Sequence, residues 1–209
     1  MSTTKEVVIA AFNRNYDWIN QLNPSVKTTI YRKGDQGLLP NEIFIENNVG
    51  RDVHTFFQHL VRRYDTLSDF TFMAQDYCFD HVSNYVEIIN GDEELWDLYS
   101  IKKIDECWFF NTEHGGILHS DKFGKPHHPF VLNIHKYWSL LFEEECPQIL
   151  HWSSAGHFCV SKNQVHKRPI QFYEKIVKIL EDDYQTPWVV ERLEHYIFDM
   201  NYAIKNIDL

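Results

Sequence analysis

The sequence predicts an α/β fold in which helices flank a central, mixed but mostly parallel sheet. Short apolar runs alternate with amphipathic segments along residues 6–75, in the order strand, helix, strand, strand, helix, strand. The runs at 6–12 and 69–75 are mostly apolar, as in strands that are covered on both faces. Alternation of this kind favours a sheet with helices packed against it.

The elements of the first half have clear ends. Strands are expected at residues 6–12, 26–35, 42–47 and 69–75. A short helix at 17–22 stops before Asn23-Pro24. A longer helix starts at Gly50, where Asp52 suits the positive helix end. Its apolar residues recur at spacings of three and four: Val53, Phe56, Phe57, Leu60, Val61 and Tyr64.

The second half gives weaker signals. Helices are expected at 92–105, 135–144, 170–180 and 188–204, and the last two follow prolines that suit a first helical turn. A strand is expected at 156–161, and the Gly-, Pro- and His-rich residues 112–130 are expected to form a long loop. No repeat or low-complexity linker divides the chain, so we expect one domain, residues 1–209.

Composition narrows the class of protein. The formal net charge of -10 argues against a broad nucleic-acid-binding surface. No apolar run approaches the length of about 20 residues that a bilayer requires, and the first 13 residues lack the pattern of a secretory signal. We therefore expect a cytoplasmic protein without a transmembrane segment. The four cysteines are far apart, and no histidine pair has HExxH spacing, so buried thiols are expected rather than a zinc site.

Polar residues follow several of the expected strands. In open α/β sheets, ligands bind beyond the carboxyl ends of the strands, and a glycine at a helix start suits an anion. The residues expected to contact a phosphorylated or nucleotide-linked ligand are Phe12, Asn13, Arg14, Tyr31, Arg32, Lys33, Asn48, Gly50, Arg51 and Gln75. Arg32 and Lys33 could equally be solvated, and Gly50 would also suit a plain tight turn.

An acid directly follows the apolar run at 70–75. Asp76 lies where a divalent cation could bridge the protein to diphosphate oxygens, and Asp80 follows four residues later. Both aspartates could instead be turn formers that end a strand.

The order of six segments resembles a family of small GT-A-type glycosyltransferases, which includes domains from large DNA viruses and from uncharacterised fungal proteins. The segments are VVIAAFN, IYRKGD, NNVGRD, FTFMAQD, GHFCVSKNQVHKRPIQFYEK and VERLEHYIF. The resemblance spans most of the chain and implies a GT-A-like nucleotide-binding sandwich, a nucleotide-sugar donor, with UDP-sugar expected, and Mn²⁺ or Mg²⁺. It also implies that VVIAAFN and NNVGRD border the nucleotide and that Asp76 binds the metal.

One departure from that family concerns the metal. The usual pair is Asp-x-Asp, whereas this chain reads Asp76-Tyr77-Cys78. Either Asp76 binds the metal with water and diphosphate alone, or Asp80 or a histidine completes the metal shell. Glu191 matches an acid of the family and is the candidate general base, with Asp80 and Glu194 in reserve. A glutamate in a helix's first turn is, however, also favoured by the helix dipole.

The expected function is therefore metal-dependent transfer of a sugar from a nucleotide diphosphate, UDP in particular, to a glycan or another hydroxyl acceptor. The expected location is the cytoplasm, or the host cytoplasm if the protein is viral. Two alternatives remain. A metal-dependent hydrolase would use the His-rich middle, including His119 and His128, and a non-catalytic carbohydrate-binding module would need neither metal nor nucleotide.

Overall fold

A five-stranded mixed sheet forms the centre of the fold. The computed structural model describes residues 3–13, 15–33, 40–45, 48–91, 108–112, 116–118, 132–152 and 157–198. The strands lie in the order β3 (Glu42–Phe44), β2 (Val26–Arg32), β1 (Lys5–Ala11), β4 (Phe70–Gln75), β8 (Phe158–Ser161). The first four run parallel, and β8 pairs antiparallel with β4. The predicted α/β class with a mixed, mostly parallel sheet is confirmed.

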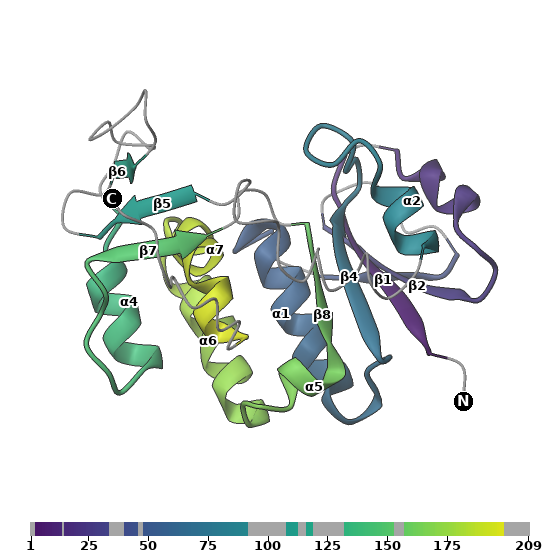
Figure 1. Cartoon of the computed structure of the whole chain (residues 1–209). Helices are drawn as coiled ribbons and strands as arrows, with labels where there is room; N and C mark the ends of the chain where they lie inside the picture. Colours follow the sequence, from purple (N-terminus) through teal and green to yellow (C-terminus); the bar gives the residue numbers. More distant parts are fainter. Residues whose placement is uncertain are drawn as a thin grey trace.

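Strand β1 lies at the centre because its sequence can be buried on both faces. Val7 and Ile9 pack into the core formed with the 3-10 helix η1 (Asp17–Gln21) and with α2 (Tyr85–Asn90). Val8 faces the opposite way, toward the core that contains α1 (Arg51–Arg63). Figure 1 shows α2 and α1 on opposite sides of the sheet.

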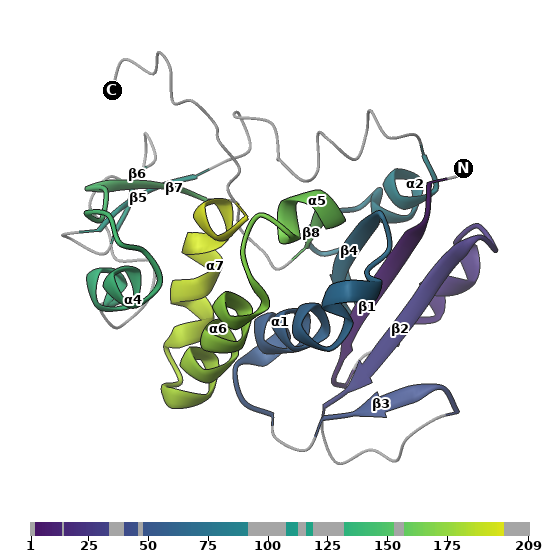
Figure 2. The ribbon, with the colours of Figure 1, turned by 90° about the horizontal axis from the view of Figure 1, so that it is seen from below.

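Several helices stack beyond one face of the sheet. Helix α1 lies between the sheet and the pair α6 (Ile170–Asp182) and α7 (Thr186–Ile197) (Figure 2). Phe56, Phe57 and Leu60 of its apolar stripe are at 0% exposure, and Val61 is partly buried. The remaining helical elements in the described residues are η2 (Tyr64–Thr66), α4 (Ile134–Leu141) and α5 (Lys162–Val165). None of the helices in the described ranges is long and apolar enough to cross a bilayer.

A second, smaller sheet was not predicted. It has the order β6 (Gly116–Leu118), β5 (Trp108–Asn111), β7 (Ile149–Trp152), with antiparallel pairs throughout. The expected loop at 112–130 therefore contains a strand in its described part. These strands have three or four residues each, too few to show a period, and β7 is distant in sequence from its partner β5. The helix expected at 92–105 lies outside the described residues.

The strands that follow β1 in the sequence lie on both sides of it in the sheet. From β1 the chain moves to β2 and β3 on one side, and through α1 it crosses back to β4 on the other side. The carboxyl ends of β1 and β4 thus form a topological switch point, where loops diverge and open α/β sheets leave a crevice.

Candidate functional site

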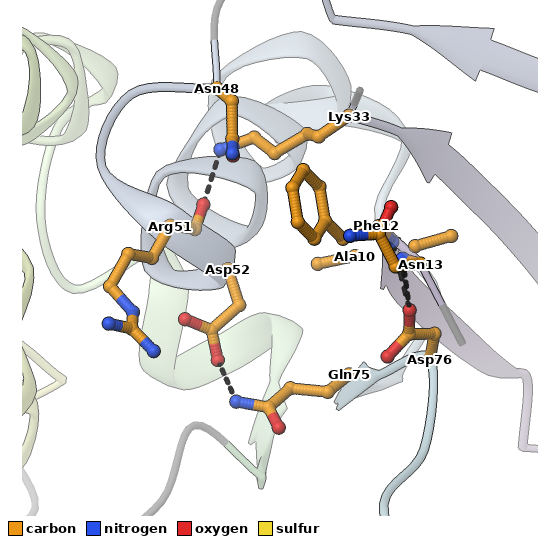
Figure 3. Close-up of a pocket in the computed structure, with 10 residues that line it drawn as sticks. Ala10, Phe12, Asn13, Lys33, Asn48, Arg51, Asp52, Gln75 and Asp76 are labelled. Carbon is orange, nitrogen blue, oxygen red and sulfur yellow. Dashed lines mark hydrogen bonds between the residues drawn. The ribbon is translucent and has the colours of Figure 1, made fainter. Parts of the chain in front are cut away.

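A cleft of about 530 Å³ opens at this switch point. It lies beyond the carboxyl ends of β1, β2 and β4 and beside the start of α1 (Figure 3). Its lining residues are Ala10, Ala11, Phe12, Asn13, Lys33, Asn48, Arg51, Asp52, Gln75 and Asp76. Seven of these ten were predicted from the sequence: Phe12, Asn13, Lys33, Asn48, Arg51, Gln75 and Asp76.

Asp76 ties the end of β4 to the turn after β1. Its Oδ2 accepts hydrogen bonds from the backbone N–H groups of Phe12 and Asn13, each at 3.0 Å. Its Oδ1 accepts from the N–H of Tyr77 at 3.0 Å, and its carbonyl accepts from the indole of Trp18 at 2.8 Å. Only 7% of Asp76 is exposed. The carboxylate therefore borders the cleft and also fixes the backbone that forms its wall.

Lys33 makes a similar tie on the opposite wall. The residue is 2% exposed, and its Nζ donates to the carbonyl of Val49 at 2.8 Å and to the carbonyl of Arg51. Burial lowers the pKa of the Lys33 ammonium to about 8, although the nearby Asp52 carboxylate opposes that shift. Lys33 is thus a cation in the cleft wall at neutral pH.

The start of α1 has a left-handed backbone. Gly50 has a φ of 66° and Arg51 a φ of 53°. A Cβ on Gly50 would lie 2.5 Å from the Cβ of His54, so only glycine fits there. The turn places the first N–H groups of α1 beside the cleft, where such groups attract anions.

Arg51 adds a positive charge next to these N–H groups. Its side chain is exposed and borders the cleft, and its guanidinium lies 5.1 Å from the ring centre of Trp188 on α7. The first turn of α7 therefore lies close to one edge of the cleft.

Asp52 was missed as a site residue, because the sequence explained it as a helix-start acid. Its Oδ2 accepts a hydrogen bond from the side-chain amide of Gln75 at 2.6 Å. This bond joins the first turn of α1 to the end of β4, and it places a second carboxylate across the cleft from Asp76 (Figure 3). The available signal was its position directly after Gly50-Arg51, at a helix start already assigned to the site.

The ring of Phe12 is the main apolar surface of the cleft. It is 42% exposed although Phe is usually buried, and it projects into the cleft toward α1 (Figure 3). Asn13 and Asn48 supply amide groups to the same cleft. An exposed aromatic face flanked by amides can stack on and hydrogen-bond to a planar ring.

Three predicted contact residues do not line the cleft. Tyr31 lies in the core on the α1 side of the sheet, where its hydroxyl hydrogen-bonds to Nδ1 of His59 at 3.1 Å. Arg32 is buried in an ion pair with Glu42, at 2.5 Å between Nη2 and Oε1. Gly50 shapes the turn without bordering the cavity. Strand alternation sends Tyr31 into the helix-covered core, and the Glu42 carboxylate holds Arg32.

The predicted acids other than Asp76 also lie outside the lining. Asp80 is exposed in the turn that follows β4. Glu191 lies on α7, one turn after Trp188, and its Oε2 accepts a hydrogen bond from Arg192 at 2.8 Å. Arg14 and the histidines at 114, 119, 127 and 128 lie outside the described residues.

The described residues contain no group of three or more His, Cys, Asp or Glu side chains arranged to hold a metal ion. Mg²⁺ and Mn²⁺, however, often bind through one or two carboxylates together with ligand phosphates and water. The carboxylate of Asp76 at the cleft wall fits such a ligand-assisted cation, whereas Asp80 does not reach the cleft.

Comparison with known protein families matches residues 7–206 to the family described as "Protein of unknown function (DUF3431)". Neither the curated proteins nor the solved structures gave a match. The matched range includes all ten residues that line the cleft. On this evidence the chain belongs to the DUF3431 family.

Proposed function

We propose that the protein is a GT-A-like glycosyltransferase that binds a nucleotide-sugar in the switch-point cleft. A UDP-sugar is the first candidate for this donor. One observation carries the proposal. The ends of the segments VVIAAFN, NNVGRD and FTFMAQD come from three separate elements, yet they line one cleft. These are the three segments that the resemblance to small GT-A enzymes assigns to nucleotide and metal.

The charges in the cleft suit a diphosphate. Lys33, Arg51 and the N-terminus of α1 are positive groups in a chain whose formal net charge is -10. We place the nucleobase against Phe12, with Asn13 and Asn48 at its edge. In this arrangement the apolar part of the cleft contacts the nucleobase, and the cationic part contacts the diphosphate.

Sugar transfer requires that the departing diphosphate be stabilised as its negative charge grows. Arg51 and the α1 N–H groups are held beside the cleft before any ligand arrives, which is the arrangement that stabilises developing charge best. A divalent cation at Asp76 would supply further positive charge to the same oxygens.

The acceptor's proton needs a base, and Glu191 remains the candidate. Its helix borders the cleft through the contact between Trp188 and Arg51. The hydrogen bond from Arg192 orients its carboxylate. Asp80 is the weaker candidate, because it lies in the turn after β4 and outside the cleft lining.

A thermal-shift titration tests nucleotide binding directly. UDP at about 100 times its dissociation constant should stabilise the protein by about 2.7 kcal/mol, which is about 5–10 °C for a chain of this length. We expect this shift with Mn²⁺ present, a smaller one without it, and little in Arg51→Ala. Arg63→Ala, an exposed arginine in the last turn of the same helix, is the matched control and should keep the full shift.

Other outcomes identify the alternatives. Stabilisation by Mn²⁺ without nucleotide would favour the hydrolase. Indifference to UDP, GDP and ADP alike, with or without metal, would refute nucleotide binding. If UDP binds, incubation with UDP-sugars followed by measurement of released UDP tests transfer, and Glu191→Gln should abolish release while retaining UDP affinity.

A further inference from the structure

Lys33 combines deep burial with an unusual set of acceptors. A buried ammonium group is costly unless hydrogen bonds or charges compensate it. Here the compensation comes from two backbone carbonyls, those of Val49 and Arg51, which flank Gly50 on both sides. Lys33 itself follows the end of β2, where its backbone N–H bonds to the carbonyl of Ala11 on β1. The side chain therefore links the rigid sheet to the turn that opens α1.

The turn it holds is strained. A left-handed backbone costs roughly 1–2 kcal/mol for a residue other than glycine, and Arg51 has a φ of 53° directly after Gly50 at 66°. Such a conformation persists only where its surroundings enforce it. Lys33 supplies that enforcement, because its two hydrogen bonds fix the carbonyls before and after Gly50 at the same time.

We propose that Lys33 is a positioning residue, which holds the Val49–Arg51 turn so that the first N–H groups of α1 and the Arg51 side chain face the cleft. Lys33 acts on the ligand through this turn. The identity of the ligand rests on the function proposed above. The role of Lys33 in fixing the conformation of the turn does not depend on that function.

The charges around Lys33 make the hold sensitive to alkaline pH. Asp52 and His54 on α1 interact with it electrostatically, and Arg51 and Asp76 border the same cleft. Burial is the main cause that brings the pKa of Lys33 down to about 8, and Asp52 works against it. A neutral amine donates more weakly to the two carbonyls than an ammonium does. The turn should therefore loosen as the pH rises past 8.

Hydrogen exchange without ligand tests the hold on the turn. In Lys33→Met at pH 7, we expect the amide of His54, which donates to the carbonyl of Gly50 in the turn at 2.9 Å, to exchange about tenfold faster or more, while the amides of β4 stay unchanged. Lys175→Met, an exposed lysine on α6, is the control. Should Lys33→Met fold poorly, the wild type alone decides: after correction for intrinsic rates, protection of the His54 amide should fall between pH 7 and 9. Unchanged protection in both experiments would overturn the proposal.

Titration with UDP and Mg²⁺ tests the effect on the ligand. Wild-type affinity should weaken about tenfold at pH 9, because about a tenth of Lys33 remains protonated one unit above its pKa. Lys33→Met should bind weakly at both pH 7 and pH 9, and Lys33→Arg, which stays charged, should show a flatter profile. Equal affinity of Lys33→Met and wild type at pH 7 would refute the positioning role. If the wild type binds no nucleotide, the proposed function fails, and the exchange experiment still decides the role of Lys33.

Discussion

Replacing Asp76 with alanine should destabilise the protein even when no metal or ligand is present. The substitution removes the acceptor of three backbone N–H groups, at 3.0 Å each. A hydrogen bond to a charged group contributes about 1.5–3 kcal/mol. The full sum is not expected, because the N–H groups of Phe12 and Asn13 border an open cleft and water can replace part of the lost bonding. We expect a loss of about 2–3 kcal/mol.

For a chain of 209 residues, that loss lowers the melting temperature by about 5–10 °C. Differential scanning calorimetry in the presence of EDTA measures it free of metal effects. Asp76→Asn keeps one carbonyl oxygen and should lose about half as much. Asp80→Ala removes an exposed aspartate four residues later and should change stability by less than about 0.5 kcal/mol.

The result separates two roles of one carboxylate. A side chain used only to bind a cation would leave the metal-free protein as stable after its removal. If Asp76→Ala melts at the same temperature as Asp80→Ala in EDTA, the three hydrogen bonds do not hold the β1 turn, and our account of the cleft wall is wrong.

Substitutions at three further positions, Gly50, His59 and Arg32, test the structure beside the cleft and in the core. Gly50→Ala should cost about 2–3 kcal/mol in urea unfolding, because its φ of 66° and a 2.5 Å side-chain contact exclude a Cβ; Gly91→Ala, at φ -77°, is the control. Burial lowers the pKa of His59 to about 4, so His59 is neutral at pH 7. Its contribution to the free energy of unfolding is complete above pH 6.5 and falls by about 3 kcal/mol as the pH drops to 4. His59→Asn should flatten the dependence of stability on pH in this range. Arg32→Ala should cost about 3–5 kcal/mol, because it leaves the buried Glu42 carboxylate without its cation, and Arg32→Lys should restore little of it.

The central sheet could be predicted because its signals are local. The run from Val7 to Ala11 is apolar at every position, and the apolar stripe of α1 has strict helical spacing. The small sheet could not be predicted in this way. Strand β7 has four residues, and only its pairing with β5 identifies it as a strand. Such pairing depends on contacts that no short window of sequence contains.

The cleft was predicted because its residues follow the ends of predicted strands. The errors concern residues whose side chains pair with distant residues that the sequence does not identify. Tyr31, Arg32 and Lys33 are consecutive, yet one enters the core, one pairs with Glu42 and one borders the cleft. Alternation along a strand separates Tyr31 from Arg32. Nothing in the sequence could reveal the partner of Arg32, because Glu42 belongs to another strand and the residues between them do not fix the register.

Asp76, directly after the apolar run FTFMAQ, could either terminate the strand or bind a metal. The geometry of the cleft is compatible with both roles. Asp76 fixes the turn after β1, and Lys33 fixes the turn before α1, so both walls of the cleft are held by charged side chains that also border it. A ligand that engages either charge meets a backbone already in place, which reduces the ordering that binding requires. Loss of affinity in a variant of Asp76 or Lys33 is therefore evidence for direct contact only when the exchange rates and stability of the ligand-free protein are unchanged.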